Sequence, residues 1–449
     1  MTEEKTNRRA QKSPSGAARN RNFLMLWTGQ SISRVGTQIT QLALPLTAAM
    51  LLHGSPLQVS AMTAIEFLPA MLFGPIAGVW VDRLDGRQIL IWTDIGRFLS
   101  LGSIPAAYAF GVLNFPILYT ATFFTGLMSI IYDSAYQVLL PNLVDGEQLL
   151  EANSKLQMSQ SIARGSGPAL GGTMVQWLSA PVAVAVDAIS YLASAVTAVL
   201  IKVPHKGTKP PRRPFFGEIV EGIRAIVTHP VRWRLSAAEA TDNFFGSGMI
   251  ALYAVFATRD LGLSAFLTGL IFAVGPLGAI TASIVLSRSG RQDLPKETII
   301  IGVLIRAVGF LLAPIATGST VTITILLCVG QILSQAGLTT LAPASVTWRQ
   351  VITPNHLLGR VLSSGMTLQY GTIPVGALFA GWLGELFGIR AALAVSAAGV
   401  FCTCLWLLGT HNPETAAHDR RMDPHTADAG LAEHEKGHDT PASEQSPKP

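Results

Sequence analysis

The sequence predicts an all-α membrane protein with twelve spanning helices arranged as two six-helix halves. Of its 449 residues, 49% are hydrophobic and 13% are charged, and the mean hydropathy is +0.42. A soluble domain has roughly 25% charged residues. Runs of about 20 apolar residues, the length that crosses a hydrocarbon core of about 30 Å, recur along the chain. The three cysteines, Cys328, Cys402 and Cys404, lie inside such runs and predict neither a disulfide framework nor a zinc site.

The spans follow one another at short intervals. We place them at 24–52, 57–81, 89–110, 116–140, 157–178, 182–201, 235–257, 264–286, 297–316, 320–345, 361–383 and 390–408. The basic segment 1–23 has no signal-peptide core of its own, so the first apolar run is expected to be a retained helix.

The distribution of Lys and Arg predicts the orientation. Of the 32 basic residues, 26 fall in the two terminal segments and the loops on the same side as the N-terminus. The opposite loops hold Arg259 and Arg390. Cytoplasmic loops retain positive charge, so both termini are expected in the cytoplasm and the chain in the inner membrane of a bacterium. The net charge of +5 then reflects topology and does not predict nucleic-acid binding.

The chain divides at a basic connector, 202–234, between two halves, 24–201 and 235–408. Apolar residues recur at helical spacing in this connector and predict an amphipathic helix on the membrane surface: Phe215, Phe216, Ile219, Val220, Ile223, Ile226 and Val227. The tail, 409–449, is predicted to be disordered and solvated, without a metal site. The halves echo each other in VDGEQLL (144–150) with ITPNHLL (352–358), and in GPIAG (74–78) with GPLGA (275–279). Such repeats are typical of secondary transporters.

A short polar motif follows the second span, GVWVDRLDGRQ, and contains Gly78, Asp82, Arg83, Gly86 and Arg87. It resembles the cytoplasmic signature of the major facilitator superfamily, with one extra residue, Asp85. The resemblance implies a latch in which a carboxylate caps a helix N-terminus and arginines pair with acids on adjacent helices. The same resemblance assigns Asp133 as the acid that meets these arginines. A plainer interpretation, that an inner loop needs arginine for topology, explains Arg83 and Arg87 alone.

A longer stretch, IYDSAYQVLLPNLVDGEQLLEANSKLQMSQSIARGSGPALGG, resembles the branch of this superfamily that includes the enterobactin exporter and macrolide-efflux proteins. The resemblance implies the major facilitator fold and proton-coupled export of small amphipathic molecules, such as antibiotics or siderophores, by a monomer. Within it Gly167, Pro168, Gly171 and Gly172 match the G-P-x-x-G-G antiporter motif of the fifth helix. The alternative for these four residues is ordinary small-residue packing between helices.

Polar residues inside the spans predict where a substrate binds, because ionisable groups in hydrocarbon usually face a cavity or a partner. Gln30, Arg34, Gln38 and Gln41 form one stripe on the first helix and are expected to line the substrate cavity. Four charges nearer the inner surface are expected to pair as a gate: Asp94, Arg97, Asp133 and Arg164.

Three carboxylates are candidates for carrying the proton. Glu66 lies about 24 Å from the inner surface at helical rise, without an obvious basic partner in the sequence. A carboxyl group shielded from water can exchange a proton near neutral pH. The alternative for Glu66 is a hydrogen bond to the first helix, or solvation by the outer headgroups. Asp187 and then Asp242 are the next candidates.

The sequence therefore predicts a transporter of small molecules and protons, with no cofactor and no enzymatic activity. No P-loop is present, so ATP is not its direct energy source. A nutrient symporter is the main alternative, and the GPALGG stretch disfavours it. A membrane-embedded enzyme or a lipid scramblase would need a polar constellation at one interface, and the sequence shows none.

Overall fold

Long α-helices make up nearly all of the chain that the structure, a computed structural model, describes: residues 20–81, 85–144, 146–202, 215–288 and 295–410. The helices of the first half are α1 (Arg21–Leu46), α2 (Pro56–Val81), α3 (Gly86–Ala109), α4 (Phe115–Leu143), α5 (Leu149–Trp177) and α6 (Ala180–Leu200). After α7 (Phe215–Val227) come α8 (Pro230–Val255), α9 (Ala265–Arg288), α10 (Pro295–Ile315), α11 (Thr320–Val351), α12 (Asn355–Phe387) and α13 (Ile389–Leu407). Three short helices, η2 (Thr47–Leu51), η3 (Gly146–Gln148) and η4 (Phe256–Asp260), complete the described elements.

Each of the twelve predicted spans corresponds to one helix, so the predicted fold class is confirmed. Seven of these helices are long and apolar enough to cross a membrane by length and composition alone: α2, α4, α6, α9, α10, α11 and α13. The other five, α1, α3, α5, α8 and α12, carry many of the polar residues described below. Several helices begin earlier or end later than the predicted spans. The reason is that hydropathy locates only the apolar residues that cross the hydrocarbon core, whereas the helix continues beyond them. The predicted tail from 411 onward and segment 1–19 lie outside the described residues.

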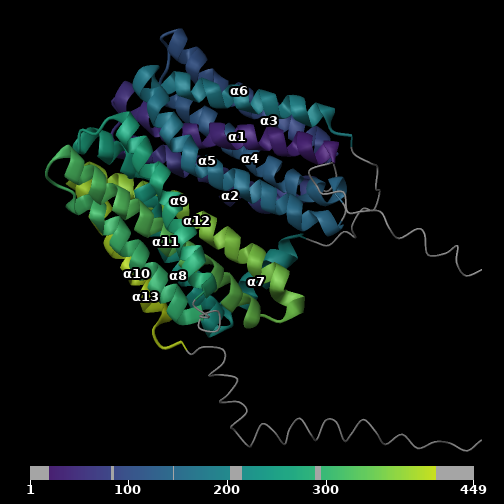
Figure 1. Cartoon of the computed structure of the whole chain (residues 1–449). Helices are drawn as coiled ribbons and strands as arrows, with labels where there is room; N and C mark the ends of the chain where they lie inside the picture. The colour runs from purple at the N-terminus through teal and green to yellow at the C-terminus, as the bar shows by residue number, and fades with distance from the viewer. Residues whose placement is uncertain (1–19, 82–84, 145, 203–214, 289–294, 411–449) are drawn as a thin grey trace, which may run out of the picture.

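Two helical bundles lie side by side (Figure 1). In the first, α1 packs on α5 and α6, and α3 packs on α4 and α6; in the second, α10 packs on α11 and α13, and α8 packs on α12 and α13. Two helix pairs join the bundles, α2 with α12 and α5 with α9. The helix α7, which falls within the predicted connector, packs on α12, where Glu221 and Arg360 form an ion pair.

Glycines allow the closest approach between the bundles. A Cβ atom at Gly172 of α5 would lie 3.0 Å from the Gly269 Cα of α9, and one at Gly381 of α12 would lie 2.6 Å from the Ser60 Cβ of α2. The two contacts are equivalent, because both pairs are 209 residues apart (381 − 172 and 269 − 60). A pseudo-twofold relation therefore connects the halves.

The same register recurs at the ends of α1 and α8. Both helices finish in a π-helical turn, η2 and η4, and equivalent bonds follow: Gly54 N–H to the Ala48 carbonyl, and Leu263 N–H to the Ala257 carbonyl, each 2.9 Å. This register corrects one predicted repeat. GPIAG and GPLGA are offset by 201 residues (275 − 74), so the two stretches stand at non-equivalent positions of the two halves.

The bundles meet at the end where η2 and η4 lie. There the Arg259 Nη1 donates to the Gly54 carbonyl at 2.7 Å, and the Leu57 N–H donates to the Glu385 Oε2 at 3.4 Å. From this end the bundles diverge toward the ends at which α1 begins and α13 finishes (Figure 1). One end of the molecule is therefore held together by contacts between the halves, and the helices of the two bundles spread apart toward the other end (Figure 1).

We expect Gly172→Leu to separate α5 from α9, because no side chain fits between the two backbones. Overpacking of this kind costs about 1–3 kcal/mol or more. Gly165→Leu, on the same helix, is the matched control, since a Cβ atom there meets nothing within 4 Å. The measurement is the melting temperature of purified protein in detergent. Equal melting temperatures for both variants would contradict the close-packing account.

Candidate functional site: a polar cavity in the first bundle

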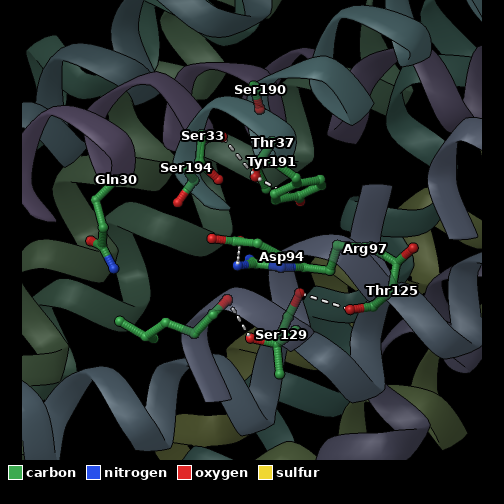
Figure 2. A network of polar contacts seen from close by, with 12 residues as sticks. Gln30, Ser33, Thr37, Asp94, Arg97, Thr125, Ser129, Ser190, Tyr191 and Ser194 are labelled. Carbon is green, nitrogen blue, oxygen red and sulfur yellow. Dashed lines mark hydrogen bonds and ion pairs between the residues drawn. The ribbon is translucent and has the colours of Figure 1, made fainter. Parts of the chain in front are cut away.

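A polar cavity lies within the first bundle, walled by α1, α3, α4, α5 and α6. Figure 2 shows part of this wall. The residues that line it are Gln30, Ser33, Arg34, Thr37, Gln38, Arg97, Ser129, Tyr132, Asp133, Gln160, Ala163 and Tyr191. Most of these side chains donate or accept hydrogen bonds, so the cavity is suited to a ligand with polar groups.

Arg97 of α3 forms the fixed centre of this wall. It pairs with Asp94, three residues earlier on the same helix face, and both residues are buried. The guanidinium carbon lies 4.0 Å from the centre of the Tyr132 ring and 4.4 Å from that of Tyr191. The Tyr191 hydroxyl is in turn 3.1 Å from the Thr37 Oγ1, as Figure 2 shows. Ion pairing and cation–π contacts together hold the Arg97 charge in one position.

The polar stripe of α1 forms two hydrogen-bonded pairs. Arg34 Nε donates to Gln30 Oε1 at 3.3 Å, and Gln38 Nε2 donates to Gln41 Oε1 at 2.9 Å. Gln30, Arg34 and Gln38 line the cavity, whereas Gln41 is exposed beyond it. The i, i+4 spacing of the sequence is what places these side chains on one face.

Of the four charges predicted to pair as a gate, Asp94 and Arg97 pair with each other. Asp133 and Arg164 are exposed, and neither forms an ion pair within the described part of the chain. Asp133 lines the cavity and is close enough to Arg34 and Arg97 to interact with their charges. Arg164 is likewise within electrostatic range of Arg34.

Glu66 of α2 is half-buried, and its carboxyl group has no hydrogen-bond or ion-pair partner among the residues that the structure describes. The alternative of a hydrogen bond to the first helix therefore has no counterpart in the described structure. The next residue, Phe67, stacks on Tyr370 of α12, with ring centres 6.5 Å apart. Glu66 thus lies beside a contact between the two bundles.

The other two proton candidates have partners. Asp187 of α6 is fully buried, accepts a hydrogen bond of 3.0 Å from Ser190, and faces Gly36 of α1. Asp242 of α8 forms an ion pair with Arg306 Nε at 3.2 Å. Among the three carboxylates, Glu66 is the unpartnered one.

A second charged cluster, in the second bundle, was not predicted from the sequence. Glu239 of α8 accepts hydrogen bonds from Ser345 and Arg349 of α11 and from Gln369 of α12. Glu239 and Asp242 share one helix face at i, i+3 spacing. Two acids at this spacing within an apolar span are the sequence signal that could have added Glu239 to Asp242.

The predicted latch lies partly outside the described residues, since Asp82 and Arg83 are not described. Gly78 falls near the end of α2, and Gly86 begins α3. Arg87 forms no ion pair with an acid among the described residues: its Nε donates to the Ala198 carbonyl of α6 at 3.2 Å, and its Nη2 donates to the Val199 carbonyl. Helix ends present unpaired carbonyls, and an arginine is a suitable partner for them. The extra residue, Asp85, caps α3 by accepting from the Arg87 N–H at 2.9 Å.

The GPALGG stretch lies in the middle of α5 and faces two neighbours. A Cβ atom at Gly171 would lie 3.2 Å from the Ile39 Cα of α1, and Gly167 approaches Gln38 of the same helix. Gly172 approaches α9, as described above, and the Pro168 carbonyl lies against Gly269. The stretch thus packs the cavity helix α1 on one side and the second bundle on the other.

Solved structures of transporters share this fold. The chain aligns with a bacterial homologue of the iron transporter ferroportin at a TM-score of 0.69 and 19% identity, over 86% of this chain and 98% of that one. For the nucleoside transporter NupG the TM-score is 0.70 and the identity 9%, over 86% of this chain and 98% of that one. The chain therefore has the fold of these solved transporters.

Sequence comparison identifies the family. A family model described as "Transmembrane secretion effector" matches residues 12–439. The chain belongs to this family of the major facilitator superfamily.

The named relatives include efflux proteins. Macrolide efflux protein A of Streptococcus pyogenes is 27% identical over 191 residues, 42% of this chain and 46% of that protein. The chain thus matches about half the length of this relative. The multidrug efflux pump Tap of Mycolicibacterium fortuitum is 27% identical over 363 residues, 77% of this chain and 85% of that protein.

We expect Arg97→Gln to destabilise the protein by about 3–5 kcal/mol, since it leaves the Asp94 carboxylate buried without its partner. The double variant Asp94→Asn, Arg97→Gln should recover much of this loss, because no charge then remains. Lys155→Gln is the control, because its ion pair with Glu151 is partly exposed and is expected to contribute only about 0.2–1 kcal/mol. Chemical unfolding in detergent measures the differences. A double variant no more stable than Arg97→Gln would exclude the pairing account.

Proposed function

We propose that this protein is a proton-driven exporter of small amphipathic molecules, such as antibiotics or siderophores. In this proposal it acts as a monomer in the inner membrane of a bacterium, with both termini in the cytoplasm. The observation that carries the proposal is the unpartnered Glu66 carboxyl group on a spanning helix, next to a contact between the two bundles.

An ionisable residue in a spanning helix is costly, by about 2.5–3.5 kcal/mol at the helix centre. Pairing offsets this cost for Asp94, Asp242 and Glu239. Glu66 has no such compensation among the described residues. A carboxyl group that alternates between its protonated and ionised forms must lack a permanent counter-ion, so the arrangement at Glu66 favours proton transfer over a structural role.

The direction of transport is inferred from two further observations. The efflux relatives match this chain over 42% and 77% of its length, and the GPALGG motif resembles that of antiporters. With the termini in the cytoplasm, the end at which the bundles spread apart faces the cytoplasm, where an exporter loads its substrate. The bundles then rock about the α2–α12 and α5–α9 contacts, and Glu66 takes a proton from outside after the substrate has left.

We expect Glu66→Gln to retain substrate binding and to lose uphill transport, since an amide keeps the shape of the side chain and cannot titrate. Glu66→Asp should keep partial activity with a shifted pH optimum. The measurement is uptake of labelled compounds into inverted membrane vesicles, with and without a protonophore, together with proton release by purified protein on substrate addition. Glu151→Gln is the control, because that carboxylate pairs with Lys155 at 3.6 Å.

Two outcomes would contradict the proposal. Equal proton release from wild type and Glu66→Gln would assign the carrier role to Asp187 or Asp242. Protonophore-sensitive movement of the compounds out of the inverted vesicles, instead of into them, would identify a symporter.

A further inference from the structure

The two bundles differ in how their internal charges are compensated. In the second bundle each buried arginine of the cluster has a carboxylate: Arg306 pairs with Asp242, and Arg349 pairs with Glu239. Side-chain hydrogen bonds from Ser345 and Gln369 further satisfy Glu239. In this cluster each of the two arginines therefore has a carboxylate partner.

Two arginines beside the cavity of the first bundle form no ion pair with a carboxylate in the described part of the chain. Arg34 lines the cavity and donates to a neutral amide, Gln30. Arg164 has no hydrogen-bond or ion-pair partner in the part of the chain that the structure describes. It follows Ala163 and stands one helical turn after Gln160, both of which line the cavity, so it lies at the cavity edge. The two arginines lie close enough to repel each other.

The total charge of the site favours a monovalent anion. Two arginines at the cavity, Arg34 and Arg164, have no ion pair among the described residues, and the carboxylate within electrostatic range of Arg34 is Asp133, so these three groups leave one positive charge. Arg97 is already engaged by Asp94 and by two tyrosine rings. The groups that line the cavity and remain available to a ligand therefore include the Arg34 guanidinium and the Gln38 and Gln160 amides. Arg164 stands at the cavity edge, within electrostatic range of Arg34.

We propose that Arg34 and Arg164 together bind a carboxylate of the exported molecule, so that this transporter selects small amphipathic monocarboxylates. Guanidinium groups form charge-assisted, bidentate hydrogen bonds with carboxylates. A bound carboxylate also removes the repulsion between the two arginines. This inference rests on the proposed function only for the direction of transport. Binding of a carboxylate at this site does not depend on that direction.

The test is equilibrium dialysis of N-benzoyl amino acids and their methyl esters against the purified full-length protein in detergent. Protein-free micelles correct for partition of each compound. We expect at least one acid of the series to bind at least tenfold more tightly than its ester, because the ester keeps the shape and lacks the charge.

Variants assign the effect to the site. Arg34→Gln and Arg164→Gln should each weaken binding of the acid about tenfold or more, the effect of losing a charge-assisted contact of about 1.5–3 kcal/mol. Arg34→Lys should retain part of the affinity. Asp133→Asn should tighten binding several-fold, since it removes a negative charge beside the bound carboxylate. Arg224→Gln, at an exposed arginine of α7 outside the cavity, is the matched control and should change nothing.

Three results would overturn the inference: no binding by any acid of the series, equal binding of acids and esters, or acid binding unaffected by both arginine variants. The Arg164→Gln variant is expected to fold like the wild type, because the Arg164 side chain is exposed and has no partner among the described residues. A change in its binding therefore reports on the site. Binding is measured without a proton gradient, so the two proposals can fail separately. If the protein binds the acids but does not export them when a proton gradient is present, the proposed function alone is overturned. If a proton gradient drives export of the esters as fast as export of the acids, this inference alone is overturned.

Discussion

Close contact between helix backbones at two equivalent places holds the halves of this transporter together. At Gly172 with Gly269, and at Gly381 with Ser60, the helices approach so closely that an added Cβ atom would overlap its neighbour. Lipid gives no hydrophobic drive for helices to associate, so close van der Waals packing between small residues has to supply it. These contacts involve few directional bonds, and each half keeps its own internal packing. The halves can therefore change their mutual angle without either half unfolding.

The buried ion pairs also lie within one half or the other. The ion pairs Asp94–Arg97, Asp242–Arg306 and Glu239–Arg349 each form within one bundle. Breaking a buried pair would cost about 3–5 kcal/mol, so a pair that crossed the bundles would resist their separation. The polar contacts described between the bundles at the closed end use a backbone carbonyl and a backbone amide, at Gly54 and Leu57. Groups at such an end can exchange these bonds for water when it opens.

Much of the fold could be predicted from the sequence, because a backbone in hydrocarbon must satisfy its own hydrogen bonds and the apolar length of each span is thereby set. The stripe on α1 was also predictable, since helical spacing alone places Gln30, Arg34 and Gln38 on one face. The Glu239 cluster was not, because its partners come from two other helices and only the folded bundle brings them together. The contacts of Arg87 with the Ala198 and Val199 carbonyls were not predictable for a related reason, because only the folded bundle brings the end of α6 beside α3.

The asymmetry between the halves identifies where their functions diverge. Equivalent glycine contacts and π-helical ends show that both halves follow one architecture. Arg306 and Arg349 of the second half each pair with a carboxylate, whereas Arg34 and Arg164 of the first half form no ion pair among the described residues. Uncompensated charge in a membrane protein is costly and is retained where it serves a ligand or an ion. Glu66, equally unpartnered in the described structure, belongs to the same half and lies on a helix that contacts the other bundle. Under the two proposals above, the groups that bind substrate and proton therefore both belong to the first half.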